Sequence, residues 1–296
     1  MAEGGPNIAL LYDDDAYAET LRRPRQPAPE APVGLMGRQV AGKEFLDAYL
    51  RHGTWSALVA LVRERARADS LVRLCRTHPS SRDRKRRLQI VEEGEFHARF
   101  FPEPPARLLY TRAPPDAKFA WARQQGGPTA FALSGVTHTL CSAGVVQQLC
   151  NLVTAPYEPF DALICTSRAV LDMVRAVTSA YADYLRDRHG GAPGVRARLE
   201  VILLGVDPDR FHPPSAEERT ARRRAFGVAE DETAVLFVGR LSHHGKAHPF
   251  PMFRGLGGRP GSRGGRSTCC CRGGRRTRRS TGPSSTGPGC SRRTSG

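Results

Sequence analysis

The sequence of 296 residues lacks any apolar run near the ~18–20 residues that a membrane-spanning helix needs, so no transmembrane segment is expected. It also lacks the features of a secretory signal, because acidic residues directly follow the short apolar patch at residues 8–12. The cysteines of the first 250 residues show neither the paired spacing of a zinc site nor a disulfide pattern; they are Cys75, Cys141, Cys150 and Cys165. These absences predict a cytoplasmic protein that holds no metal ion and no cofactor.

Acidic side chains are missing from one part of the chain, since none follows Glu232. The formal net charge of +16 is therefore uneven along the sequence. Residues 251–296 hold eleven arginines, no lysine and no acid, whereas residues 1–250 hold 34 basic and 29 acidic side chains. The first 250 residues are thus only mildly basic, and the total charge alone does not indicate a nucleic-acid-binding protein.

Short apolar runs alternate with segments of helical periodicity along the first 250 residues. The runs predict strands at residues 8–12, 107–111, 129–133, 162–166, 199–203 and 234–238. Helices are predicted at residues 43–51, 55–67, 117–124 and 217–226, and a polar basic loop at residues 80–87. Strands that are apolar throughout and alternate with helices indicate an α/β fold, in which a parallel sheet is covered on both faces.

The clearest local unit begins with the apolar strand at residues 162–166. Ser167 follows in the position of a helix N-cap, and apolar residues then recur at helical spacing from Val170 to Leu185. Basic residues precede Gly190, which suits the C-terminal end of a helix. Sheets of this kind bind ligands beyond the carboxyl ends of their strands, so the residues just after each strand are the candidates for function.

A glycine-rich segment at residues 34–42 precedes the helix predicted at residues 43–51. Gly37 and Gly42 would let backbone amides approach a phosphate or a sugar at the helix N-terminus. The segment is not a Walker loop, because Lys43 is followed by a glutamate rather than by Ser or Thr. The alternative interpretation is an ordinary glycine-rich turn.

Two other segments place polar groups after predicted strands. His138, in the motif GVTHT, follows the strand at residues 129–133, where it could hydrogen-bond a substrate hydroxyl or act as a base. Arg240 and Lys246 follow the strand at residues 234–238 and could converge on a diphosphate. The alternatives are a structural or simply exposed histidine and a solvated basic loop. The nearby histidines His243, His244 and His248 fit no standard metal-ligand spacing.

Four blocks together resemble a family 4 glycosyltransferase of the GT-B fold. They are GLMGRQVAGKEFLDAYL at residues 34–50, GVTHT at 135–139, DALICTSRA at 161–169 with LGVDPDRF at 204–211, and VLFVGRLSHHGK at 235–246. The resemblance extends over about residues 8–252. The pairing of GVDPDRF with VGRLS is its most specific part, and it marks the passage between two Rossmann-like domains.

The resemblance implies transfer of a sugar from a nucleotide-diphosphate donor to an acceptor, with retention and without a metal ion. Arg240 and Lys246 match the residues that contact the donor diphosphate. His138 matches the histidine that lines the cleft near the transferring sugar, and Gly37 and Gly42 match the loop that closes over the reacting centre. The expected partners are a nucleotide-sugar donor and a sugar or lipid-linked acceptor, with no specific nucleic acid.

The resemblance also predicts the division of the chain. An N-terminal Rossmann-like, acceptor-side domain is expected at residues 1–205, a linker at 206–231, the start of a nucleotide-sugar-binding domain at 232–253 and a disordered Arg/Gly-rich tail at 254–296. A pair of glutamates seven residues apart, which such enzymes carry in the second domain, has no counterpart here. We therefore expect a reading-frame shift near residue 254, a strand at 234–238 without sheet partners, and impaired activity.

Two alternative functions remain open from the sequence. The arginine-rich tail could bind nucleic acid by charge alone, although residues 251–296 offer one aromatic residue, Phe253, for stacking on bases. The first domain could instead be a catalytically silent acceptor-binding domain. Salt-dependent RNA binding that disappears on deletion of the tail would favour the first alternative, and acceptor binding without sugar transfer would favour the second.

Overall fold

The computed structural model describes residues 7–13, 17, 37–53, 55, 57–78, 87–209, 211–238, 251, 267–272 and 292–293. The chain divides into two compact units, Met1–Asp207 and Pro208–Gly296. Within the described residues, no helix combines the length and the apolar character needed to cross a bilayer.

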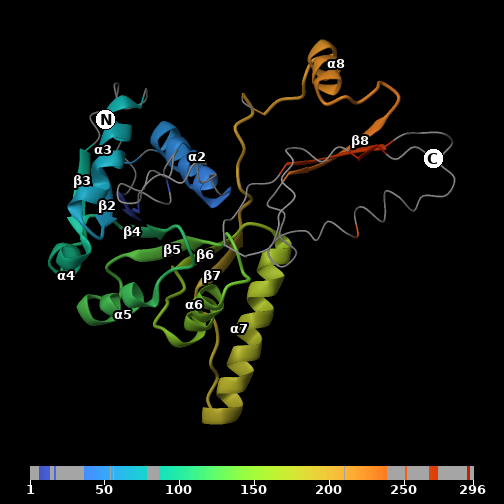
Figure 1. The fold of residues 1–296 in the computed structure, drawn as a ribbon. Helices are drawn as coiled ribbons and strands as arrows, with labels where there is room; N and C mark the ends of the chain where they lie inside the picture. The colour runs from blue at the N-terminus through green and yellow to red at the C-terminus, as the bar shows by residue number, and fades with distance from the viewer. Residues whose placement is uncertain are drawn as a thin grey trace, which may run out of the picture. The chain divides into compact units, whose positions relative to one another are not determined.

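The first unit is built on a seven-stranded sheet in the order β3-β2-β1-β4-β5-β6-β7 (Figure 1). All six neighbouring pairs are parallel. The strands are β1 (Ile8–Leu11), β2 (Ala57–Val62), β3 (Arg87–Glu92), β4 (Leu108–Thr111), β5 (Ala132–Val136), β6 (Ala162–Cys165) and β7 (Arg198–Val201). The prediction of an α/β, Rossmann-like parallel sheet is confirmed.

Helices cover both faces of this sheet, as Figure 1 shows. They are α2 (Gly37–His52), η1 (Arg65–Ala68), α3 (Asp69–Thr77), η3 (Glu93–Glu95), α4 (Phe96–Phe100), α5 (Ala117–Gly126), α6 (Ala143–Thr154) and α7 (Arg168–His189). Successive strand residues alternate between two hydrophobic clusters. In β1, Ala9 packs in the cluster beneath α4 to α7, and Leu10 packs in the cluster beneath α2 and α3. This double burial explains why the inner strands β1, β2 and β6 are apolar throughout.

The prediction of a helix at residues 55–67 is wrong. The segment ALVALV forms β2, which lies between β1 and β3 and is almost completely buried, and the short η1 follows it. A continuous apolar run buried on both faces carries no periodicity that separates strand from helix, so the segment was ambiguous. Other elements of the first unit were not predicted, among them α3, β3, α4 and α6. Of the loop expected at residues 80–87, residues 80–86 lie outside the described residues, and Arg87 begins β3.

The local unit around α7 matches its prediction closely. The Ser167 hydroxyl accepts a hydrogen bond from the Val170 amide at 3.2 Å and so caps the helix. Gly190 ends the helix with φ of +74°, a conformation that favours glycine, and Arg186, Arg188 and His189 occupy the last turn. The predicted strands and helices at β1, β4 to β7 and α5 are also confirmed, with shifts of one to three residues at their ends.

The second unit contains α8 (Ala216–Ala225) and a sheet in the order β10-β9-β8. A capping box between Ser215 and Glu218 starts α8. Strand β8 (Thr233–Val238) pairs in parallel with β9 (Ser267–Arg272), and β10 (Arg292–Arg293) pairs with β9 in antiparallel fashion.

The predicted absence of sheet partners for residues 234–238 is therefore wrong, and so is the predicted disorder where β9 and β10 form. The physical reason is that the backbone amide and carbonyl groups of β8 require partners, which the strand at Ser267–Arg272 supplies. The other residues of the tail at 254–296 lie outside the described residues, where disorder stays a prediction.

Candidate functional site

The order of the sheet reverses between β1 and β4, because β2 and β3 extend to one side of β1 and β4 to β7 to the other. In parallel sheets, the crevice at such a reversal is where ligands bind, beyond the carboxyl ends of the strands. Asp13 follows β1 and Arg112 follows β4, and the Arg112 guanidinium donates a hydrogen bond to the Asp13 carboxylate. Arg67, from η1, brings a second guanidinium to within 4.0 Å of the same carboxylate. All three side chains remain partly exposed, so among the described residues the cluster presents two guanidinium groups and one carboxylate to solvent.

A buried phenol lies next to this cluster. The Tyr17 ring stacks on the Tyr12 ring with centroids 5.0 Å apart, and its hydroxyl is buried without a hydrogen-bond partner. Burial raises the pKa of Tyr17, and the neighbouring Tyr110 raises it further, so the phenol stays protonated at neutral pH. Tyr17 therefore holds a protonated hydroxyl that is closed to solvent and lies near the Arg112 guanidinium. We refer to Asp13, Tyr17, Arg67 and Arg112 as the switch-point cluster.

The carboxyl ends of β4 and β5 are locked together. The Thr111 hydroxyl lies 2.8 Å from the Ala113 carbonyl and 3.2 Å from the Ser134 carbonyl. A Cβ atom added to Gly135 would lie 2.2 Å from the Ala113 oxygen, so only glycine allows the turn after β4 to rest on β5. This contact fixes the carboxyl end of β5, where the loop after β5 begins.

His138 lies in that loop, two residues beyond the end of β5, and its side chain is exposed. The loop is anchored on both sides of the histidine. Thr137 is buried and hydrogen-bonds to β6, and Ser142 caps the N-terminus of α6 through the Val145 amide. The structure thus places an accessible imidazole at the carboxyl edge of the sheet, where it can donate or accept a hydrogen bond.

The two glycines predicted to form a loop lie in a helix instead. Gly37 begins α2, and Gly42 lies inside it. The helix starts six residues earlier than predicted. Leu46 and Leu50 pack onto the sheet, and the turns before them continue the same helix. A Cβ atom on Gly37 would meet nothing within 4 Å, so no close backbone approach requires glycine there. The predicted loop conformation of residues 37–42 is wrong, and the role of Gly37 and Gly42 near the reacting centre stays a prediction.

Arg240 and Lys246, the predicted diphosphate contacts, lie outside the described residues, as do His243, His244 and His248. Their roles stay predictions. Among the residues that the structure does describe, no group of three or more His, Cys, Asp or Glu side chains could hold a metal ion.

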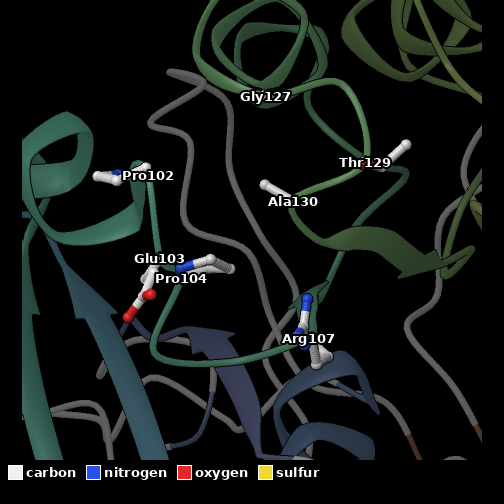
Figure 2. Close-up of a pocket in the computed structure, with 7 residues that line it drawn as sticks. All are labelled: Pro102, Glu103, Pro104, Arg107, Gly127, Thr129 and Ala130. Atoms are coloured by element: carbon white, nitrogen blue, oxygen red, sulfur yellow. The ribbon is translucent and has the colours of Figure 1, made fainter.

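A cavity of about 570 Å³ lies at the amino ends of the strands, on the side of the sheet away from the candidate site. Arg107 directly precedes β4 and Ala130 lies just before β5, so the cavity opens at the amino ends of these strands. Figure 2 shows the lining residues Pro102, Glu103, Pro104, Arg107, Gly127, Thr129 and Ala130. Because His138 and the switch-point cluster lie at the carboxyl ends, this cavity is separate from the candidate site.

The sequence analysis missed all four members of the switch-point cluster. Asp13 and Arg112 are 99 residues apart, and neither belongs to a motif that suggests a role. The usable signal was their position directly after two apolar strands. It becomes informative only once β1 and β4 are known to be neighbours in the sheet.

Comparison with known proteins gives one informative similarity. No family model matches the chain. Over 106 residues, or 35% of its length, the chain is 38% identical to a D-inositol 3-phosphate glycosyltransferase from Geodermatophilus obscurus. The matched segment spans about a fifth of that relative, 22% of its length.

Proposed function

We propose that this chain carries the acceptor-side domain of a GT-B glycosyltransferase, which transfers a sugar from a nucleotide-diphosphate donor to an acceptor with retention. The observation that carries the proposal is the 38% identity over 106 residues with a glycosyltransferase. The parallel Rossmann-like sheet supports it, because such a sheet gathers polar side chains from several strands at one ligand-binding edge.

In this proposal, His138 hydrogen-bonds the transferring sugar at the carboxyl edge, and Arg240 and Lys246 stabilise the charge that develops on the diphosphate leaving group. Because His138 is exposed, replacing it with alanine should leave the melting temperature nearly unchanged. The same replacement should abolish transfer in a version of the enzyme that has a complete donor-binding domain. A large loss of stability with normal transfer would show that the histidine is structural.

We further propose that the acceptor is a phosphorylated polyol. The relative is named for D-inositol 3-phosphate, and the switch-point cluster offers groups that suit a phosphate. Arg112 and Arg67 supply planar guanidinium donors that are partly exposed to solvent. Asp13 holds both guanidiniums at the crevice before the ligand arrives.

Titration calorimetry with inositol phosphate and with unphosphorylated inositol tests this acceptor class. Replacing Arg112 with methionine should weaken inositol phosphate binding about 10- to 100-fold, as expected for a lost hydrogen bond to a charged group. Binding of unphosphorylated inositol should not change. Arg186→Met, which removes an exposed guanidinium from the end of α7, is the matched control. Equal affinities of the two arginine variants for inositol phosphate would contradict the assignment.

The donor side requires a separate test. Residues 233–296 contain no acidic side chain, so they offer no counterpart to the expected glutamate pair. We expect little turnover from this chain with a panel of UDP-, GDP- and ADP-sugars, because positioning both substrates supplies roughly 7–11 kcal/mol of barrier reduction. A version with the downstream reading frame restored should be active. Equal activity of both versions would overturn this reasoning, and acceptor binding without transfer by either would indicate a silent acceptor-binding domain.

A further inference from the structure

Thr137 is the residue directly before His138, and it is a polar side chain with only 1% exposure. Its backbone amide donates to the Ile164 carbonyl at 3.0 Å, and its hydroxyl donates to the same carbonyl at 3.2 Å. The hydroxyl also accepts a hydrogen bond from the Thr166 amide at 3.2 Å. Both the donor and the acceptor capacity of this hydroxyl are therefore used, which fixes its orientation.

The two groups that Thr137 contacts belong to the next strand and the loop after it. Ile164 lies in β6, and Thr166 lies in the segment that leads into α7. The Thr137 hydroxyl thus joins the loop after β5 to the loop after β6. Since Ser167 caps α7 one residue later, the loop after β6 is itself firmly placed.

The loop that carries His138 is also restrained before Thr137. Gly135 packs against the Ala113 carbonyl so closely that no Cβ atom fits, and the Thr111 hydroxyl bonds to the Ser134 carbonyl. The backbone is therefore held on one side by β4 and on the other by β6 until it reaches His138. The His138 side chain itself is exposed to solvent.

We propose that Thr137 is a positioning residue, whose hydroxyl sets the direction in which the His138 imidazole faces the ligand-binding edge. The role of the His138 orientation in sugar transfer rests on the proposed glycosyltransferase function. The orientation itself does not depend on that function, because it can be measured without substrate. Thr137 acts through the backbone and touches no reacting atom.

The test uses the full chain labelled with ¹³C and ¹⁵N, with the His138 imidazole signal assigned by its loss in a His138→Gln variant. Thr137→Val removes the hydroxyl while keeping the shape of the side chain. Thr137→Ser keeps the hydroxyl. Thr178→Val is the matched control, because Thr178 is also a buried threonine whose hydroxyl bonds to the carbonyls of Val174 and Arg175 within α7.

In Thr137→Val, the His138 imidazole signal and its titration midpoint should shift, and the Thr166 amide should exchange about tenfold faster, as the net free energy of one hydrogen bond predicts. Thr137→Ser should retain the parental signal, and Thr178→Val should leave it unchanged. An unshifted His138 signal in Thr137→Val, or an equal shift in Thr178→Val, would overturn the proposal. If the valine variant does not fold, Thr137→Ala is judged by the same criterion. A chain that passes this test yet fails to bind inositol phosphate would refute the proposed function and leave the positioning role standing.

Discussion

The buried ion pair between Arg123 and Asp161 allows a quantitative prediction of stability. Both side chains are almost completely buried, and the two guanidinium nitrogens each lie 2.6 Å from a carboxylate oxygen. The guanidinium also donates to the Phe131 carbonyl at 2.9 Å. Asp161 accepts two further hydrogen bonds, from the amides of Leu133 at 2.7 Å and Glu158 at 2.8 Å. Every oxygen of the carboxylate is thus satisfied in the native fold.

Replacing Arg123 with methionine keeps much of the side-chain volume and removes the compensating charge. The Asp161 carboxylate would remain buried with only its two amide donors. Breaking a buried pair from one side costs about 3–5 kcal/mol, which is a large fraction of the ~5–15 kcal/mol that stabilises a typical domain. The pair between Arg186 and Asp183 has the same 2.6 Å separation, but half or more of each side chain is exposed. Arg186→Met should therefore cost only about 0–1 kcal/mol.

Urea unfolding of the chain and the two variants measures both losses, with circular dichroism as the probe and the m-value checked for constancy. The comparison isolates the effect of burial on the free energy of unfolding, because the substitution and the nitrogen–oxygen distance are the same in both pairs. The reasoning is refuted if the two variants lose equal stability, or if Arg123→Met loses less than about 1 kcal/mol.

Three further outcomes are expected. Gly135→Ala should destabilise the fold by about 1–3 kcal/mol in thermal unfolding, because the new Cβ atom would meet a carbonyl oxygen, whereas Gly144→Ala in the open first turn of α6 should be neutral or stabilising. Tyr157→Phe should cost about 0.5–1.5 kcal/mol, because its hydroxyl donates to a carbonyl at 2.6 Å, whereas Tyr17→Phe should cost nothing in denaturant titrations. Burial raises the pKa of the Cys75 thiol to about 11, so the thiol ionises at lower pH in the unfolded chain than in the folded one. The free energy of unfolding should consequently fall as the pH rises from about 9 to 11, and the fall should be smaller in Cys75→Ala; an identical pH profile would contradict this.

Local signals made some elements predictable from the sequence. The strand before Ser167, the cap at Ser167 and the glycine that ends α7 all depend on neighbours within a few residues, and all three are confirmed. By contrast, β2 is defined by burial on both faces, which no local pattern of ALVALV reveals. The start of α2 was misplaced because its glycines suggest a turn, whereas packing of the helix against the sheet decides the outcome.

The candidate site shows the same division between local and long-range information. His138 could be placed at the carboxyl edge because it follows an apolar strand directly. The pairing of Arg112 with Asp13 could not be predicted, since it depends on which strands are neighbours. The buried, unpartnered hydroxyl of Tyr17 also depends on residues far away in the sequence, including Tyr110 and Arg112.

The Arg123–Asp161 pair lies at the amino ends of β5 and β6, whereas His138 and the switch-point cluster lie at the carboxyl ends of the strands. The backbone carbonyl of Asp161 also accepts the Arg198 amide and so ties the start of β7 to the same point. The buried ion pair therefore stabilises the rim of the sheet opposite the proposed site. Substitutions of exposed residues at the carboxyl rim, such as Arg112 or His138, leave the contacts of this pair unchanged. Partly exposed residues at the proposed site can thus be replaced one at a time while the buried pair continues to hold the fold together.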